Sequence, residues 1–245
     1  MLIWIALFLI VLAISLVLAI QSMADYETRP AHFSTPYTLF LVTKEKELNQ
    51  DILQDLHRSL LQKGFILSLE RLFRGGRRAL VLYGPSAILK PLSGRLGLIE
   101  LEDYSKREIK PGQGVVAWEV GRKAQDDKLV VGNIFQNIPE FTEEEEFWWQ
   151  VVTQPTKDSF KSIIRAVVLA VDQRRASALQ NELLQIGKDK GLSLLPQAYS
   201  TPQMVKLYQD RSIPVNFFSK GPKGVILNLQ PDELQSLLSS SSVST

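Results

Sequence analysis

The order in which β-rich and amphipathic runs alternate after Tyr37 is the feature that most restricts the fold of this chain. The run YTLFLVT is typical of a β-strand, and ELNQDILQDLHRSLLQKG then has the apolar spacing of a helix that buries one face and ends at Gly64. Two further strands, FILSLERLF and RALVLYG, are joined by Arg74-Gly75-Gly76-Arg77, whose paired glycines suit a hairpin turn. The buried face of the helix is predicted to contain Ile52, Leu53, Leu56, Leu60 and Leu61.

A proline-initiated helix, PSAILKPLSGRL, and a last strand, LGLIELEDY, complete this first unit. The resulting order is βαββαβ, in which two helices cover one face of a four-stranded antiparallel sheet. The sequence therefore predicts an α+β fold that contains a ferredoxin-like unit over residues 37–104.

A second, related α+β unit is predicted over residues 105–238. Strands are expected at VVAWEVG, KLVVGNI and FWWQVVTQ, and STPQMVKLYQDRS is expected to form a short helix. The runs IIRAVVLAVD, RRASALQNELLQIGKDKG and GVILNLQPDELQSLL repeat, in the same order, a strand, a helix and a strand followed by a helix from the first unit. This similarity is explained either by an internal duplication or by a periodicity that such folds share.

An uncharged segment, LIWIALFLIVLAISLVLAI, runs from Leu2 to Ile20 and is long enough to cross a membrane as a helix. A retained transmembrane helix over residues 1–23 is favoured over a cleaved signal peptide, because no basic residue precedes the run and signal cores usually span only about 7–15 residues. Basic residues follow the run, so the positive-inside rule predicts a single-pass protein of the cell membrane with a cytoplasmic body. Residues 24–36 are expected to form a tether, and residues 239–245 a disordered serine-rich tail.

Composition limits the classes of function. With 245 residues, 45% of them hydrophobic, the chain can bury a sizeable core. The formal charge of +2 is too small to indicate a polyanion-binding protein by itself, although it allows a local basic patch. The absence of cysteine excludes disulfides, thiolate metal sites and a cysteine nucleophile.

No motif in the sequence predicts a catalytic, cofactor or metal site. The run GPSAILK lacks the second glycine and the hydroxyl residue of a phosphate-binding loop, so we interpret it as the start of a helix. His32 and His57 have no carboxylates at metal-ligand spacing. Glu100, Glu102 and Asp103 are interpreted as the solvated face of an edge strand rather than as an acid–base pair. We therefore expect a protein that is not an enzyme and has neither a cofactor nor a small-molecule substrate.

Two groups of residues are candidates for contact with partners. Four arginines at the predicted hairpin concentrate positive charge that suits phosphate in nucleic acid or lipid, although arginines also keep an exposed sheet edge soluble. A tryptophan and the apolar side of PDELQSLL are candidates for a protein interface, and packing back onto the body is the alternative for that helix. The arginines are Arg71, Arg74, Arg77 and Arg78; the interface candidates are Trp148, Leu234, Leu237 and Leu238; Glu143 to Glu146 are interpreted as a solvated loop.

Three stretches resemble the region between the membrane anchor and the motor domain in the membrane-anchored relatives of the conjugative type IV secretion ATPases. FILSLERLFRGGRRALVLYGPSAILKPL is similar to that family's strand, hairpin, strand and short helix, and IIRAVVLAVDQRRASALQNELLQIG to the strand and helix before its motor. VILN followed by ELQSLL resembles the strand-plus-helix signature that precedes the ATPase core. The chain departs from the family in two places, because LQPD lengthens the spacing between Asn228 and Glu233, and serines from Ser239 replace a His-x-Pro element.

This resemblance implies a non-enzymatic, membrane-anchored assembly or interaction module of a type IV secretion-like or DNA-transfer apparatus, without the ATPase motor. Its expected partners are the membrane and either a separate ATPase or further copies of the chain, with nucleic acid as a further candidate. The alternative hypothesis is a membrane-anchored extracytoplasmic ligand-binding or envelope protein.

Overall fold

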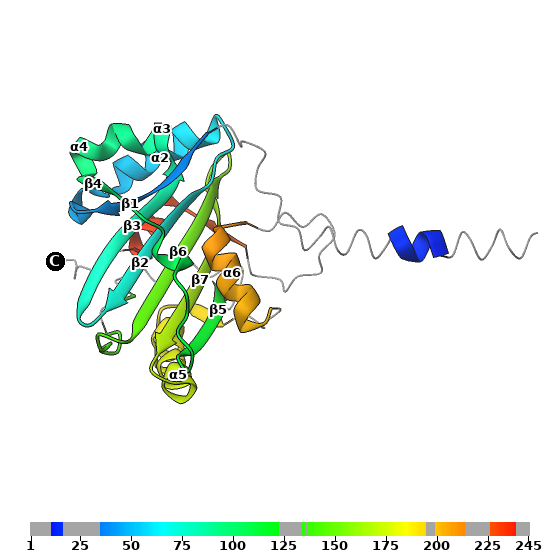
Figure 1. The fold of residues 1–245 in the computed structure, drawn as a ribbon. Coiled ribbons are helices and arrows are strands. Elements are labelled where there is room, and N and C mark those ends of the chain that lie inside the picture. Colours follow the sequence, from blue (N-terminus) through cyan, green and yellow to red (C-terminus); the bar gives the residue numbers. More distant parts are fainter. Residues whose placement is uncertain are drawn as a thin grey trace, which may run out of the picture.

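The computed structural model describes residues 11–16, 35–122, 134–135, 137–194, 199–213 and 226–238. Within these ranges nine strands form one antiparallel sheet in the order β4-β1-β3-β2-β6-β7-β5-β8, and β9 pairs with the beginning of β7 (Figure 1). The strands are β1 (Tyr37–Val42), β2 (Leu67–Arg74), β3 (Arg77–Pro85), β4 (Leu98–Leu101), β5 (Gly114–Arg122), β6 (Glu146–Pro155), β7 (Phe160–Ala170), β8 (Leu192–Leu194) and β9 (Leu227–Leu229). The helices are α2 (Gln50–Leu61), α3 (Ser86–Leu89), α4 (Ser93–Leu96), α5 (Gln173–Asp189), α6 (Thr201–Asp210) and α7 (Pro231–Ser236), with 3-10 turns η1 (Glu45–Glu47), η2 (Lys90–Leu92) and η3 (Tyr104–Lys106).

Local sequence signals account for most of the first half. The Gly75–Gly76 turn between β2 and β3 has positive φ at both residues, which a tight two-residue hairpin turn requires and which glycine adopts without steric cost. Helix α2 begins where the Asn49 side chain accepts a hydrogen bond from the Ile52 amide. The predicted single helix PSAILKPLSGRL is instead divided into α3, η2 and α4, because Pro91 has no N–H to continue an α-helical ladder.

A seam between β2 and β6 joins the two predicted units into one body. Residues 67–74 of β2 pair in register with residues 146–153 of β6, from Leu67 opposite Thr153 to Arg74 opposite Glu146. The first half keeps the order β4-β1-β3-β2, but β2 is an interior strand of the larger sheet. The α+β class is confirmed, and the first half has the antiparallel strand order β4-β1-β3-β2 of the predicted ferredoxin-like unit. Its sheet does not end there, because β2 continues through β6 into one antiparallel sheet with the second half.

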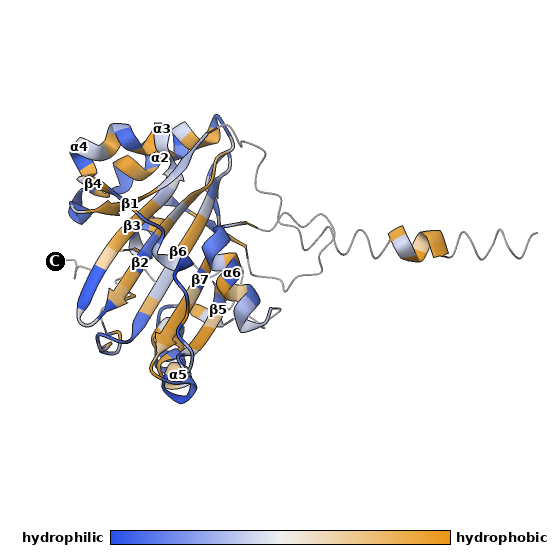
Figure 2. Ribbon diagram, in the orientation of Figure 1, coloured by the Kyte–Doolittle hydropathy of each residue, from blue (hydrophilic) through white to orange (hydrophobic). Residues whose placement is uncertain are grey.

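The two faces of the sheet are covered differently. Helices α2, α5 and α7 pack on what we call the first face, where they bury the largest apolar cluster of the described residues. Helix α6 packs on the second face, over β5 and β7, and buries a smaller cluster around Met204, Val205 and Tyr208 (Figure 1). Figure 2 shows apolar colour along much of β5 and β7, mixed colour along β6 and hydrophilic colour at the tip of the β2–β3 hairpin. Both faces of the central strands are therefore buried, and the polar hairpin tip projects from them.

The prediction of a transmembrane helix is wrong for the part of the chain that the structure describes. Only residues 11–16 of the Leu2–Ile20 run are described as helical, and no described helix is long and apolar enough to cross a membrane. Several predicted segments lie outside the described residues: the rest of that run, most of the tether, the serine-rich tail and all of the strand KLVVGNI except Ile134.

Candidate functional site

A row of polar side chains crosses four adjacent strands in the middle of the sheet. Glu70 of β2 lies opposite Gln150 of β6, Gln150 lies opposite Arg165 of β7, and Arg165 lies opposite Glu119 of β5. Strand side chains alternate between faces, and all four of these point to the second face, beneath α6 and η3. All four are buried. Because charged groups are costly to bury without partners, this row requires compensating contacts.

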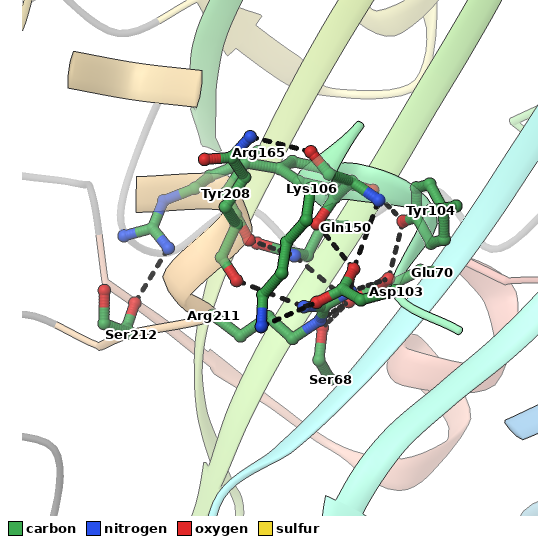
Figure 3. A network of polar contacts seen from close by, with 12 residues as sticks. Ser68, Glu70, Asp103, Tyr104, Lys106, Gln150, Arg165, Tyr208, Arg211 and Ser212 are labelled. Atoms are coloured by element: carbon green, nitrogen blue, oxygen red, sulfur yellow. Dashed lines mark hydrogen bonds and ion pairs between the residues drawn. The ribbon is translucent and has the colours of Figure 1, made fainter. Parts of the chain in front are cut away.

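Arg211 supplies the main compensation (Figure 3). Its Nε donates to Glu70 Oε1 at 2.7 Å, and its Nη1 donates to Asp103 Oδ2 at 2.8 Å. The guanidinium also lies 4.5 Å from the ring centroid of Tyr83. Arg211 ends α6 in the left-handed region, with a φ of 50°, a conformation that is unfavourable for a residue with a Cβ. The backbone is held there by the buried side-chain contacts.

Two tyrosines extend the hydrogen-bond network of Glu70, one directly and one through the other. Tyr104 OH donates to Glu70 Oε2 at 2.6 Å and lies 2.7 Å from Tyr208 OH, so the Tyr208 hydroxyl donates to the Tyr104 oxygen. Ser68 Oγ and Gln150 Nε2 donate to Glu70 Oε1. Burial raises the pKa of the Tyr104 and Tyr208 phenols well above the usual value, and the nearby negative charge of Glu70 adds to this increase. Both phenols are therefore protonated donors at neutral pH.

Arg165, on β7 in this row, binds the C-terminal end of α6. Arg165 Nε lies 3.2 Å from Glu119 Oε1, and its Nη1 donates to the carbonyl oxygens of Leu207 and Ser212 at 2.9 and 2.8 Å. A cation at the C-terminal end of a helix satisfies its last carbonyls and interacts favourably with its dipole. Arg165 and Arg211 thus fasten the C-terminal turn of α6 to the sheet at two points.

We call Ser68, Glu70, Asp103, Tyr104, Glu119, Gln150, Arg165, Tyr208 and Arg211 the buried polar cluster. Within it, Glu70 accepts five hydrogen bonds, and both Asp103 oxygens accept from Arg211. Burial alone would raise the pKa of Asp103, but hydrogen bonds and charge from Arg211 lower it overall. Gln150 Oε1 is a buried atom without a partner among the described residues. Through these contacts the carboxylates position η3 and α6.

A groove on the second face lies beside this cluster, and η3 forms one of its walls. It has a volume of about 810 Å³, and Leu41, Leu72 and Ala79 contribute apolar surface from β1, β2 and β3. Tyr104 and Trp148 belong both to the groove wall and to the packing over the cluster. We call this the hairpin groove. Its charged lining residues are Arg74, Arg77, Arg78, Lys106, Arg107, Glu102, Asp103 and Glu146.

The four predicted arginines divide between two places. Arg74 and Arg77 line the hairpin groove together with Lys106 and Arg107, which sequence reasoning did not single out. Arg78 borders this groove, but it lies opposite Phe73 and its side chain points to the first face, where it lines a pocket with Arg71. Arg71 is buried on the first face, where its Nε donates to the Leu238 carbonyl and its Nη1 to Glu45 Oε2, both at 2.6 Å. The contact of these arginines with phosphate stays a prediction, and the structure gives Arg71 a separate position from Arg74 and Arg77.

The acidic loop before β6 contacts the hairpin tip. Arg77 Nη2 lies 2.6 Å from Glu143 Oε2, and Arg74 Nε donates to the Glu143 carbonyl at 2.8 Å. Arg107 Nη1 lies 2.6 Å from Glu146 Oε1. A Cβ at Gly75 would overlap the Glu143 carboxylate, so a larger residue there would displace this side chain. Glu143 is therefore an intramolecular partner of the hairpin rather than only a solvated side chain.

The predicted interface residues are buried. Trp148 packs against Tyr104 and Tyr208 and donates from Nε1 to Glu146 Oε2 at 2.8 Å. Leu234, Leu237 and Leu238 lie in the core on the first face, beside α2. In this structure the helix α7 packs back onto the body, which is the alternative that the sequence left open.

The histidine and carboxylate candidates are also placed. His57 Nε2 lies 3.1 Å from the Ser159 carbonyl, and its ring packs on Phe160; His32 lies outside the described residues. Glu100 and Glu102 are exposed as expected, whereas Asp103 is taken into the ion pair with Arg211. Among the described residues no group of three or more His, Cys, Asp or Glu side chains could hold a metal ion.

Comparison with known proteins assigns no family. No protein-family model matches the chain, and a search of the curated proteins found no significant match.

Proposed function

We propose that this chain is a non-enzymatic interaction module of a type IV secretion-like or DNA-transfer apparatus, and that the hairpin groove is where it holds a partner. The observation that carries this proposal is the contrast between the two polar regions. The carboxylates of the buried polar cluster are engaged with arginines and phenols, whereas the groove next to it is open and lined by charge and apolar surface. An arrangement of this kind provides a rigid wall for binding rather than a reacting group.

The resemblance of three stretches to the region that precedes the motor in conjugative type IV secretion ATPases supports the choice of apparatus. Two of these stretches contribute to this architecture, because residues 65–92 contain the β2–β3 hairpin and residues 163–187 contain most of β7 and α5. The partner under this proposal is a separate ATPase or another copy of the chain. A cytoplasmic location of the body is part of the same proposal.

Site-specific photocrosslinking in the native cell tests the proposal. A photoreactive amino acid replaces Ala79 in the groove in one full-length variant and the exposed Lys63, beyond α2, in a matched control. We expect adducts that form from position 79 but not from position 63, and that contain an ATPase of a transfer apparatus or the chain itself. Adducts of equal yield from both positions would contradict the proposal. So would turnover of ATP by the purified full-length chain that a point substitution abolishes.

C-terminal reporter fusions test the location. Fluorescence of a cytoplasmic reporter is expected, and alkaline phosphatase activity without that fluorescence would favour the extracytoplasmic alternative instead.

A further inference from the structure

The hairpin groove combines three properties that together define a class of ligand. Its apolar floor comes from three neighbouring strands, β1, β3 and β2, so it is a broad surface rather than a narrow hole. Four cationic side chains, Arg74, Arg77, Lys106 and Arg107, and three carboxylates surround the floor. Arg78 lies opposite Phe73, so its side chain points to the first face, where it lines a pocket together with Arg71. Asp103 shares the buried Arg211 with Glu70 and lies 3.8 Å from Lys106. The groove therefore presents an excess of one positive charge around an apolar centre.

The arginines at the rim bind carboxylates in this structure. Arg77 contacts Glu143, and Arg107 and Arg74 both contact Glu146, at 2.6 and 3.4 Å for the latter two. A guanidinium offers a planar set of donors that matches a carboxylate. Arg74 and Arg77 side chains remain more than half exposed while they make these contacts, so they can also face a carboxylate from outside.

The aromatic residues of the groove argue against nucleic acid as the ligand. Single-stranded nucleic acids bind through bases that stack on exposed rings, in addition to phosphate contacts. Trp148 is only 2% exposed, and its ring faces Tyr104 edge-on at 5.3 Å and Arg107 at 5.5 Å.

We propose that the hairpin groove docks an acidic, amphipathic segment of a partner protein. Apolar side chains of the segment pack on Leu41, Leu72 and Ala79, and its carboxylates contact the arginines and lysine of the rim. This inference rests on the proposed function, since it names the chemistry of the partner that the module would hold. Glu143, which contacts Arg77, then competes with the outermost carboxylate of the segment.

Fluorescence anisotropy with the purified full-length chain tests this inference. The probe is a fluorescein-labelled peptide of about 20 residues, with glutamates on one helical face and leucines on the other. Comparison probes are a peptide of the same composition with the leucines distributed evenly, a single-stranded DNA oligonucleotide of equal length, and phosphatidylglycerol vesicles. We expect the amphipathic peptide to bind most tightly, with an affinity that falls as salt is added.

Charge reversal locates the site. The double substitution Arg74→Glu/Arg77→Glu should weaken peptide binding by about tenfold, because two exposed contacts become repulsive. Arg58→Glu, at an exposed position of α2, is the matched control and should leave the affinity unchanged. Circular dichroism and thermal melting of each variant verify that the fold is retained, and Lys106→Glu provides an independent variant on the opposite wall.

Three results would overturn the inference: no measurable binding of the amphipathic peptide at low salt, equal binding by the Arg74→Glu/Arg77→Glu variant, or tighter binding of DNA or vesicles than of the peptide. The crosslinking experiment distinguishes this failure from failure of the proposed function. Adducts specific to position 79 without peptide binding would leave an interaction module whose ligand has another chemistry.

Discussion

Replacement of Arg211 by methionine tests whether the paired charges of the buried polar cluster stabilise the fold. Arg211 is 1% exposed and Glu70 is fully buried, and their side chains approach to 2.7 Å. Methionine fills similar space but leaves the Glu70 carboxylate in the interior with only neutral donors. Removing one partner of such a pair usually costs about 3–5 kcal/mol, so we expect Arg211→Met to lower the free energy of unfolding by that amount.

A double-mutant cycle separates the charge pair from packing. Glu70→Gln removes the charge but keeps an acceptor for Tyr104, and the double variant Arg211→Met/Glu70→Gln has neither of the two paired charges. We expect the double variant to recover a substantial part of the stability that Arg211→Met loses, because no uncompensated charge remains at position 70. Arg211→Lys should be intermediate, since lysine keeps the charge and lacks the planar fork.

Urea unfolding of the full-length chain, followed by tryptophan fluorescence, provides the free energies. If Arg211→Met does not fold, the comparison of Arg211→Lys with wild type still measures the stability lost when the planar guanidinium donors are removed. The reasoning is refuted if Arg211→Met lies within about 1 kcal/mol of wild type, which is the range of an exposed ion pair. It is also refuted if the double variant is no more stable than Arg211→Met.

Three further predictions concern other parts of the structure. Glu143→Gln should tighten binding of the amphipathic acidic peptide by about twofold in the same anisotropy assay, because an exposed ion pair worth roughly 0.5 kcal/mol no longer occupies Arg77; weaker binding would contradict the competition. The pKa of Asp103 is lowered overall, so its ion pair stabilises the fold fully above the unfolded-state pKa of about 3.9 and this stabilisation is lost as the pH falls through the lower folded-state pKa. Urea midpoints should therefore show that the stability difference between wild type and Asp103→Asn shrinks below about pH 4. A stability difference that grows below about pH 4 would contradict the lowered pKa. Leu234→Ala should cost about 2–5 kcal/mol because the side chain is fully buried on the first face; an unchanged urea midpoint would instead indicate an interface role for this residue.

Apolar periodicity predicted the local elements of the chain better than their assembly. Spacing alone predicted the buried residues of α2, and Ile52, Leu53, Leu56 and Leu60 are buried, whereas Leu61 at the end of the helix is 40% exposed. Periodicity carries no information about which strand edges meet. The pairing of β2 with β6 depends on contacts between residues far apart in sequence. The predicted boundary between two units therefore falls where the structure has a continuous sheet.

The buried polar cluster had a signal in the sequence that gains meaning only from register. Glu70, Gln150, Arg165 and Glu119 each interrupt a largely apolar strand, and such interruptions are individually unremarkable in strands with one solvated face. They become a site because three separate strand pairings align them in one row. The role of Arg211 was harder to predict from the sequence, because this residue follows a short helix and reaches the row only through its left-handed backbone conformation.

The seam between β2 and β6 also sets the order of events during synthesis. Leu67 and Thr153 are 86 positions apart, so β2 leaves the ribosome long before the strand that will cover its edge. Until β6 pairs with it, the eight-residue strand β2, which is rich in leucine, has unpaired backbone N–H and C=O groups along one edge. Closing so long a loop is slow compared with forming a local hairpin. We therefore infer that the nascent chain passes through a stage in which it is most open to strand addition by other molecules, and that completion of β6 ends this stage.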